Sequence, residues 1–138
     1  MFKTMLVEDN LGIRQLVKNT LEFQFPSMDI IEASDGVEAF QKIASHPPNL
    51  IFMDIGLPGE NGLELTRKIK GKYPKTIIII LTSYDSIEYR EAAIRYKADG
   101  FLAKGSSTPD DVGRLVESIL LEKGFNADGS EPKEDRDH

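Results

Sequence analysis

The sequence contains no cysteine and only two histidines, His46 and His138. Without cysteine the chain can form no disulfide bond, no thiolate nucleophile and no cysteine-ligated zinc site. His46 stands before Pro47 at an expected helix end, and His138 is the last residue of an acidic tail. Two isolated histidines also disfavour a zinc or copper site, so the chemistry is expected to depend on other side chains.

The chain also lacks a long apolar run and an excess of positive charge. Its longest apolar run is Ile77–Leu81, well short of the roughly 18 residues that a membrane-spanning helix needs. The amino-terminal stretch, residues 1–7, is too short for a secretory signal. The formal net charge of −6 argues against non-specific binding to nucleic acids or anionic membranes. We therefore expect a cytoplasmic protein that binds neither membranes nor nucleic acid directly.

Five apolar runs alternate along the chain with five amphipathic patterns. Strands are expected at residues 3–7, 29–33, 50–53, 77–81 and 100–103, each followed by a helix that begins near Asn10, Asp35, Asn61, Ser86 or Thr108. This alternation is typical of an α/β protein with right-handed crossovers. It predicts one doubly wound, five-stranded parallel sheet of the flavodoxin-like (βα)5 type, with helices on both faces.

The composition changes after residue 124. Residues 125–138 carry five acids and two bases and almost nothing apolar, a composition that favours disorder. We therefore expect a single folded domain at residues 1–124 and a disordered acidic tail at residues 125–138.

Polar side chains stand where four of the expected strands end: Glu8, Asp9, Asp54, Thr82 and Lys104. The carboxyl ends of parallel strands lie along one edge of a sheet, and open α/β folds place their sites there. A cluster of bare carboxylates is unfavourable without a cation. Oxygen ligands with room for water suit Mg²⁺, with Mn²⁺ as the alternative. The sequence therefore predicts a divalent metal site at this edge.

Such a set of residues is suited to phosphoryl transfer onto a carboxylate. Asp54 would be the nucleophile, and it needs no general base because a carboxylate is already deprotonated at neutral pH. The metal, Lys104 and the Thr82 hydroxyl would hold the phosphoryl oxygens. Taken alone, Asp54 could equally be a residue that caps the following turn, so the interpretation depends on all the strand ends together.

Four motifs, in this order and spacing, resemble those of the receiver domains of two-component response regulators. They are Leu6–Asn10, Met53–Gly59, Leu81–Ser83 and Gly100–Lys104, and the resemblance extends over residues 1 to about 123. It implies that Glu8 and Asp9 form a metal pocket together with Asp54 and the backbone carbonyl of Gly56. It also implies that Asp54 accepts phosphate, that Lys104 binds it, and that Thr82 and Phe101 form a conformational switch.

The resemblance also implies a signalling role and a set of partners. A sensor histidine kinase or a phosphotransfer protein would donate the phosphoryl group, and a downstream effector domain or protein would respond. A phosphorylation-dependent homodimer is a further partner that the resemblance allows. The chain would not be an enzyme beyond its own phosphorylation and dephosphorylation. The local sequence around Glu8 and Asp9 and at Gly100–Lys104 also resembles that of receivers that precede DNA-binding domains. A longer parent protein could therefore be a transcriptional regulator. The helix expected at residues 86–96 has the weakest apolar stripe, which fits a movable element.

Two glycines depart from the commonest pattern of that family. Gly105 stands where a proline often follows the lysine. Gly56 offers no side chain to shield a phosphoryl group, so we expect water to reach phospho-Asp54 more freely unless Tyr84 covers it. A haloacid-dehalogenase-like aspartyl phosphatase, the alternative enzyme class, would need an aspartate where Gly56 stands. A binding protein whose pocket never receives phosphate is a third possibility.

Overall fold

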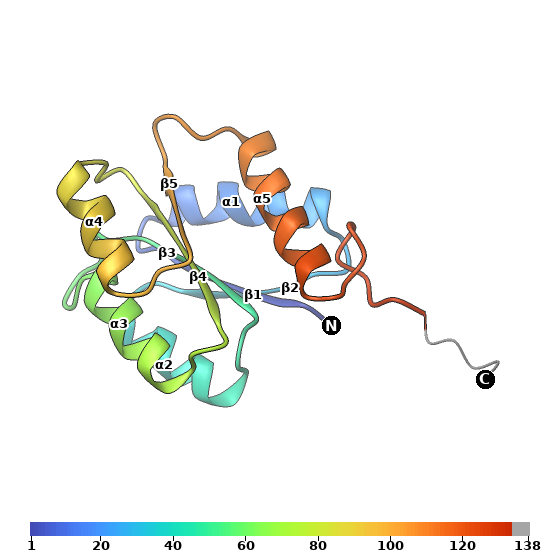
Figure 1. The fold of residues 1–138 in the computed structure, drawn as a ribbon, viewed down its shortest axis with the longest axis horizontal. Helices are drawn as coiled ribbons and strands as arrows, with labels where there is room; N and C mark the ends of the chain where they lie inside the picture. The colour runs from blue at the N-terminus through green and yellow to red at the C-terminus, as the bar shows by residue number, and fades with distance from the viewer. Residues whose placement is uncertain (134–138) are drawn as a thin grey trace.

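Five parallel strands form one sheet in the order β2-β1-β3-β4-β5 (Figure 1). The strands are β1 (Lys3–Val7), β2 (Asp29–Ala33), β3 (Leu50–Met53), β4 (Ile77–Thr82) and β5 (Gly100–Ala103). This computed structural model describes residues 1–133. The predicted doubly wound parallel sheet is confirmed, and β3, whose four residues are all buried, lies at its centre.

Within residues 1–133 there are five helices; four of them connect successive strands, the fifth follows β5, and each begins directly after a polar capping residue. They are α1 (Leu11–Gln24), α2 (Gly36–Ser45), α3 (Gly62–Lys72), α4 (Ile87–Arg95) and α5 (Pro109–Glu122). The side chains of the capping residues Asn10, Asp35, Asn61, Ser86 and Thr108 accept hydrogen bonds from backbone N–H groups in the first turn of each helix. Such caps satisfy donors that the helix itself leaves unpaired. The expected helix starts are therefore confirmed.

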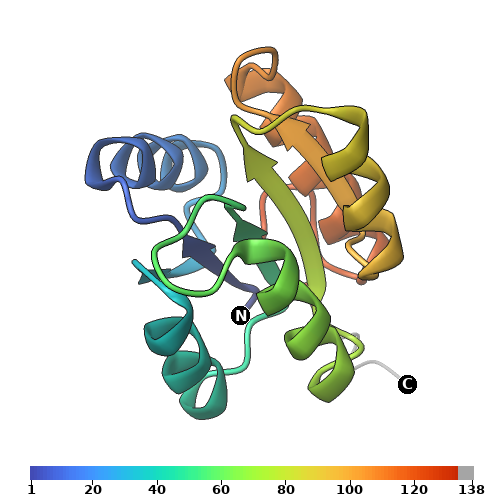
Figure 2. The same cartoon turned by 90° about the vertical axis from the view of Figure 1, so that its left-hand side faces the viewer.

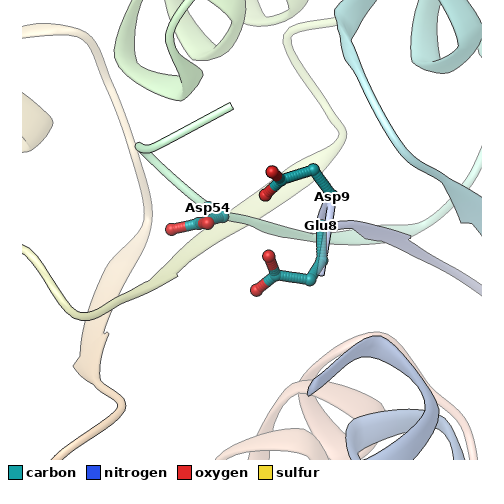
Figure 3. A group of neighbouring side chains, drawn as sticks. All are labelled: Glu8, Asp9 and Asp54. Carbon is teal, nitrogen blue, oxygen red and sulfur yellow. The ribbon is translucent and has the colours of Figure 1, made fainter. Parts of the chain in front are cut away.

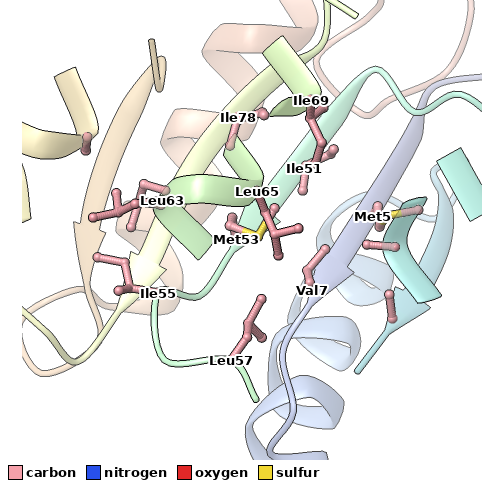
Figure 4. Packing of buried hydrophobic residues seen from close by; sticks show 14 of the residues in the cluster. Met5, Val7, Ile51, Met53, Ile55, Leu57, Leu63, Leu65, Ile69 and Ile78 are labelled. Atoms are coloured by element: carbon pink, nitrogen blue, oxygen red, sulfur yellow. The ribbon is translucent and has the colours of Figure 1, made fainter. Parts of the chain in front are cut away.

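Alternate strand residues pack into two separate cores, because successive side chains of a strand point to opposite faces of the sheet. Met5, Ile51 and Ile78 belong to one buried cluster with residues of α2, α3 and α4, part of which is drawn in Figure 4. On the other face, Leu6 and Phe52 pack with residues of α1 and α5. In Figure 1, α1 and α5 lie above the sheet and α2 and α3 lie below it. Figure 2 faces the edge where the strands end.

The segment after α5 turns back towards the start of the chain. The Phe125 ring packs edge-on against Phe2 with 5.2 Å between ring centroids, and the Met1 ammonium group pairs with Glu131. Phe125 is also partly buried against the core cluster that includes residues of α5. The disorder that the sequence predicts for residues 125–138 stays a prediction. Residues 134–138 of the predicted tail lie outside the described residues.

Within residues 1–133, none of the helices has both the length and the apolar character that crossing a membrane requires.

Candidate functional site

Three carboxylates meet at the carboxyl edge of the sheet (Figure 3). Glu8 and Asp9 follow β1 and Asp54 follows β3, and these two strands are neighbours in the sheet. One carboxylate oxygen from each residue lies within 4.8 Å of the other two. Glu8 and Asp54 are buried, whereas Asp9 is exposed. The structure thus brings together the acids that the sequence assigns to a metal site.

The strand ladder continues into the site and holds its backbone. The Glu8 N–H donates to the carbonyl oxygen of Ala33 on β2 at 3.0 Å, and the Asp54 N–H donates to that of Val7 at 3.1 Å. Both acidic residues are therefore fixed by the sheet although neither belongs to a strand. Their side chains emerge from a rigid base, which favours a defined arrangement of oxygen atoms.

Lys104 completes the cluster from the end of β5. Its ammonium group pairs with the Glu8 carboxylate and lies 3.5 Å from Asp54 Oδ2. Its backbone N–H donates to the Thr82 carbonyl oxygen at 2.9 Å, which ties the residue to β4. Burial raises the pKa of Glu8, with a further upward contribution from the charge of Asp54, and these effects outweigh the hydrogen bond from Lys104. One ammonium group thus only partly compensates three carboxylates.

One oxygen of Asp54 is buried without a partner. Among the described residues, Asp54 Oδ1 is the buried side-chain oxygen or nitrogen that makes no hydrogen bond. An unsatisfied buried acceptor costs about 1–3 kcal/mol, and more when it is charged. The unpaired oxygen and the carboxylates beside it offer a metal ion oxygen ligands from Glu8, Asp9 and Asp54, which fits a hard divalent cation.

The residues assigned to a switch lie on β4 and β5. Thr82 is fully buried, and its hydroxyl oxygen accepts a hydrogen bond from the Tyr84 N–H at 3.3 Å. Phe101 pairs with Ile80 in the register of the two strands, two positions before the end of β4. Thr82 and Phe101 therefore share one face of the sheet. The Arg90 guanidinium group of α4 covers the half-buried Phe101 ring, 4.6 Å from its centroid.

Tyr84 lies against Gly56, beside the loop that follows Asp54. A Cβ atom added to Gly56 would lie 2.6 Å from Cε2 of the Tyr84 ring. The ring thus fills the space that a side chain at position 56 would need, as expected if Tyr84 covers this position.

Every peptide bond within residues 1–133 is trans, so the Lys104–Gly105 bond follows the ordinary geometry. The role of the Gly56 carbonyl as a metal ligand stays a prediction.

Gly62 positions Asp54, a role that was not predicted from the sequence. A Cβ atom at Gly62 would lie only 1.9 Å from the Asp54 carbonyl oxygen, so α3 begins in direct contact with the backbone of that residue. The Gly62 N–H also donates to the Ile55 carbonyl oxygen at 3.0 Å. The sequence offered only the Asn61-Gly62 pair as a signal, and that pair marks a helix start equally well.

Gly62→Ala is expected to lower the free energy of unfolding by about 1–3 kcal/mol, because the added methyl group must displace the Asp54 backbone. Gly71→Ala in the same helix is the matched control, since a Cβ atom there meets nothing within 4 Å. It should raise stability by about 0.5–1 kcal/mol through helix propensity. Urea unfolding measures both variants, and equal stabilisation by the two substitutions would contradict the close contact.

The chain belongs to the response regulator receiver domains, the signalling domains of two-component systems. A family model described as "Response regulator receiver domain" matches residues 4–117. The resemblance found in the sequence motifs is therefore confirmed.

Individual relatives extend this result. The chain is 39% identical over 119 residues to the oxygen regulatory protein NreC of Staphylococcus carnosus, covering 85% of this chain and 52% of that protein. A CheY-like receiver domain protein from Methanospirillum hungatei JF-1 aligns with a TM-score of 0.82 at 28% identity, over 89% of this chain and 96% of that one. A LuxR-family response regulator from Aurantimonas sp. SI85-9A1 gives 0.79 at 30% identity, over 87% and 85%. The chain spans about half the length of the curated relatives it matches.

Proposed function

We propose that this receiver domain accepts a phosphoryl group on Asp54 in a Mg²⁺-dependent reaction. The observation that carries the proposal is the buried and unpartnered Oδ1 of Asp54, next to an ammonium group and two further carboxylates. That oxygen can take a new partner without the loss of an existing hydrogen bond. A divalent cation would be held by Glu8, Asp9 and Asp54, and by the Gly56 carbonyl oxygen if the family resemblance extends to it.

The chain's own residues have defined parts in the transfer. An Asp54 carboxylate oxygen forms the new bond to phosphorus while the bond from phosphorus to the donor breaks, and the donor leaves with its electron pair. Lys104 lies close enough to Asp54 to hold a phosphoryl oxygen, and the buried Thr82 hydroxyl can donate to another. When bound, Mg²⁺ supplies positive charge that neutralises phosphoryl oxygens.

Phosphorylation would then act on the switch residues. A phosphoryl group adds negative charge and acceptor oxygens, and the Thr82 hydroxyl would turn from the Tyr84 N–H towards it. Such a movement leaves space beside Phe101, whose ring is covered by Arg90 of α4. Only Ala92 and Ala93 of α4 are buried, so this helix is anchored by small side chains and is suited to shift. The change redistributes two conformations rather than building a new one.

The partners follow from the family and are part of the same proposal. The donor would be a sensor histidine kinase or a phosphotransfer protein, and the response would pass to a downstream effector domain or protein or to a homodimer. Two of the similar proteins are an oxygen regulatory protein and a LuxR-family response regulator. A longer parent could thus carry an output domain that binds DNA, whereas direct nucleic-acid binding is not proposed for residues 1–138. A cytoplasmic location also stays a prediction.

The direct test is uptake of phosphate from a small acyl phosphate. With Mg²⁺ and acetyl phosphate, the chain should gain one phosphoryl group, measured by intact-protein mass spectrometry. Removal of the metal with EDTA should slow this uptake at least a hundredfold, because the three carboxylates then repel the incoming phosphate. Phosphate uptake at the same rate with EDTA would contradict the proposal. So would the accumulation of more than one phosphoryl group on each chain.

Tyr84→Ala is expected to shorten the lifetime of phospho-Asp54 several-fold, because the ring that lies over Gly56 limits the access of water. The ring is 47% exposed, so stability should change little. Ile87→Ala on the neighbouring helix removes an exposed apolar side chain and serves as the control. The decay of the phosphorylated species, followed by mass spectrometry after removal of the donor, measures the lifetime. Equal lifetimes in the parent and the Tyr84 variant would exclude shielding by this ring.

A further inference from the structure

We infer that Arg14 of α1 is a positioning residue that holds Glu8, and with it the acidic site, in the geometry needed to bind a divalent cation. The inference rests on the proposed function, because it concerns the carboxylates assigned there to the metal. Within residues 1–133, the Arg14 side chain forms hydrogen bonds with the Glu8 carbonyl oxygen and the Glu32 carboxylate, and with no carboxylate of the acidic site.

The Arg14 guanidinium group joins two elements that are far apart in the sequence. Its Nη1 donates to the Glu8 carbonyl oxygen at 2.7 Å, and its Nε donates to Glu32 Oε1 at 3.0 Å. The side chain is only 15% exposed. A planar guanidinium group donates hydrogen bonds in several fixed directions at once. A lysine ammonium group has a single nitrogen atom and cannot hold two partners in this fixed geometry. These two hydrogen bonds of Arg14, to Glu8 and to Glu32, link the site to β2, and we call them the Arg14 bracket.

Glu32 gives this bracket a firm base. Lys18 Nζ donates to its second carboxylate oxygen at 3.1 Å, and Lys42 Nζ donates to its carbonyl oxygen at 2.5 Å. Burial works to raise the pKa of Glu32, but hydrogen bonds from Lys18 and Arg14 prevail and lower the pKa. The residue is therefore ionised at neutral pH, and Arg14 is held by a charged partner on a strand of the sheet.

Arg14 supplies the constraint on Glu8 that the sheet does not provide. The sheet fixes the N–H of Glu8 through Ala33, and the guanidinium group fixes its carbonyl oxygen. The backbone turns directly after this carbonyl, and the Asn10 N–H donates to Glu8 Oε2 at 3.2 Å. Asp9 lies between these two points. The orientation of both Glu8 and Asp9 thus depends on the peptide group that Arg14 holds. Residues that hydrogen-bond to metal ligands and orient them in this way affect the affinity for the metal.

The test measures Mg²⁺ binding and stability separately on the full 138-residue chain. Titration with MgCl₂, followed by ¹H–¹⁵N amide shifts, gives the dissociation constant without any phosphodonor, and thermal unfolding in EDTA gives the metal-free stability. Arg14→Met should weaken Mg²⁺ binding about tenfold. Arg14→Lys keeps the charge and one of the two contacts, so its affinity should be intermediate. Arg114→Met on α5, where the side chain is 78% exposed, is the control and should bind like the parent.

A double-mutant cycle shows whether Arg14 acts through its partner. Glu32→Gln should also weaken Mg²⁺ binding. Combining it with Arg14→Met should weaken binding no further, because both substitutions disrupt the same interaction between Arg14 and Glu32. This variant and Arg14→Lys keep the test usable if Arg14→Met does not fold. Parent-like affinity in the Arg14 variants, or a lowered melting temperature without a change in affinity, would overturn the inference alone. A parent chain that binds no Mg²⁺ would overturn the proposed function as well.

Discussion

Asp54→Asn is expected to abolish phosphorylation of the chain by acetyl phosphate. The amide is a poor nucleophile, and it replaces a charged oxygen of the acidic cluster with a neutral one, so Mg²⁺ binding should also weaken. The exchange is nearly isosteric, and Asp54 lies at a buried strand end whose N–H remains paired with Val7. The fold should therefore persist, and the loss should be confined to the chemistry.

Intact-protein mass spectrometry after incubation with Mg²⁺ and the donor measures this result. Asp110→Asn, which removes an exposed acid from the start of α5, is the control for the loss of one negative charge. It should be phosphorylated like the parent. A phosphoryl group found on the Asp54 variant at the parental rate would move the acceptor to another acid, with the neighbouring Asp9 as the first residue to map by peptide fragmentation.

Lys104→Met is expected to have the second largest effect, on stability as well as on transfer. Removing the ammonium group leaves Glu8, Asp9 and Asp54 facing one another without compensation. Breaking a buried pair from one side costs about 3 kcal/mol, and the loss of a group that stabilises the transferred phosphoryl oxygens slows transfer on the order of a hundredfold. Added Mg²⁺ should restore part of the stability, because binding to the folded state alone stabilises it.

Lys70→Met is the matched control for this experiment. Lys70 is also largely buried, and it pairs with Asp99 at 2.9 Å while donating to the Thr76 carbonyl oxygen at 2.8 Å. Its loss should destabilise the chain comparably but without any response to Mg²⁺. Urea unfolding with and without the metal distinguishes the two variants. A Lys104 variant that gains no more from Mg²⁺ than the Lys70 variant would show that the lysine does not balance the acidic cluster.

Local signals were sufficient to predict the sheet and the helix starts. A strand such as β3 is apolar throughout and is followed at once by a carboxylate and a turn that contains glycine and proline. Its burial and its end can therefore both be predicted from consecutive residues. Asn10 and Thr108 likewise cap helices through contacts within three residues. Because parallel strands end at one edge, the convergence of Glu8, Asp54 and Lys104 also followed from the order of strands and helices.

Other features depend on register and packing between distant segments and could not be predicted. The contact between Gly62 and the Asp54 carbonyl oxygen requires knowledge of where α3 meets the sheet. The bracket from Arg14 to Glu32 joins a helix and a strand whose relative placement is set by the whole core. Phe125 is a single apolar residue in an acidic stretch, and composition gives no sign that Phe2 contacts it.

The acidic site lies on the rim of the sheet, so its residues belong to both sides of the molecule. Glu8 is held by Arg14 of α1, whereas Thr82 is the last residue of β4. Ile80, two positions earlier on the same face of that strand, packs in the core beneath α3 and α4. Figure 3 shows Glu8 and Asp9 approaching Asp54 from different directions. A phosphoryl group on Asp54 would therefore lie beside residues anchored on both faces of the sheet, so its effect would not be confined to one layer of helices.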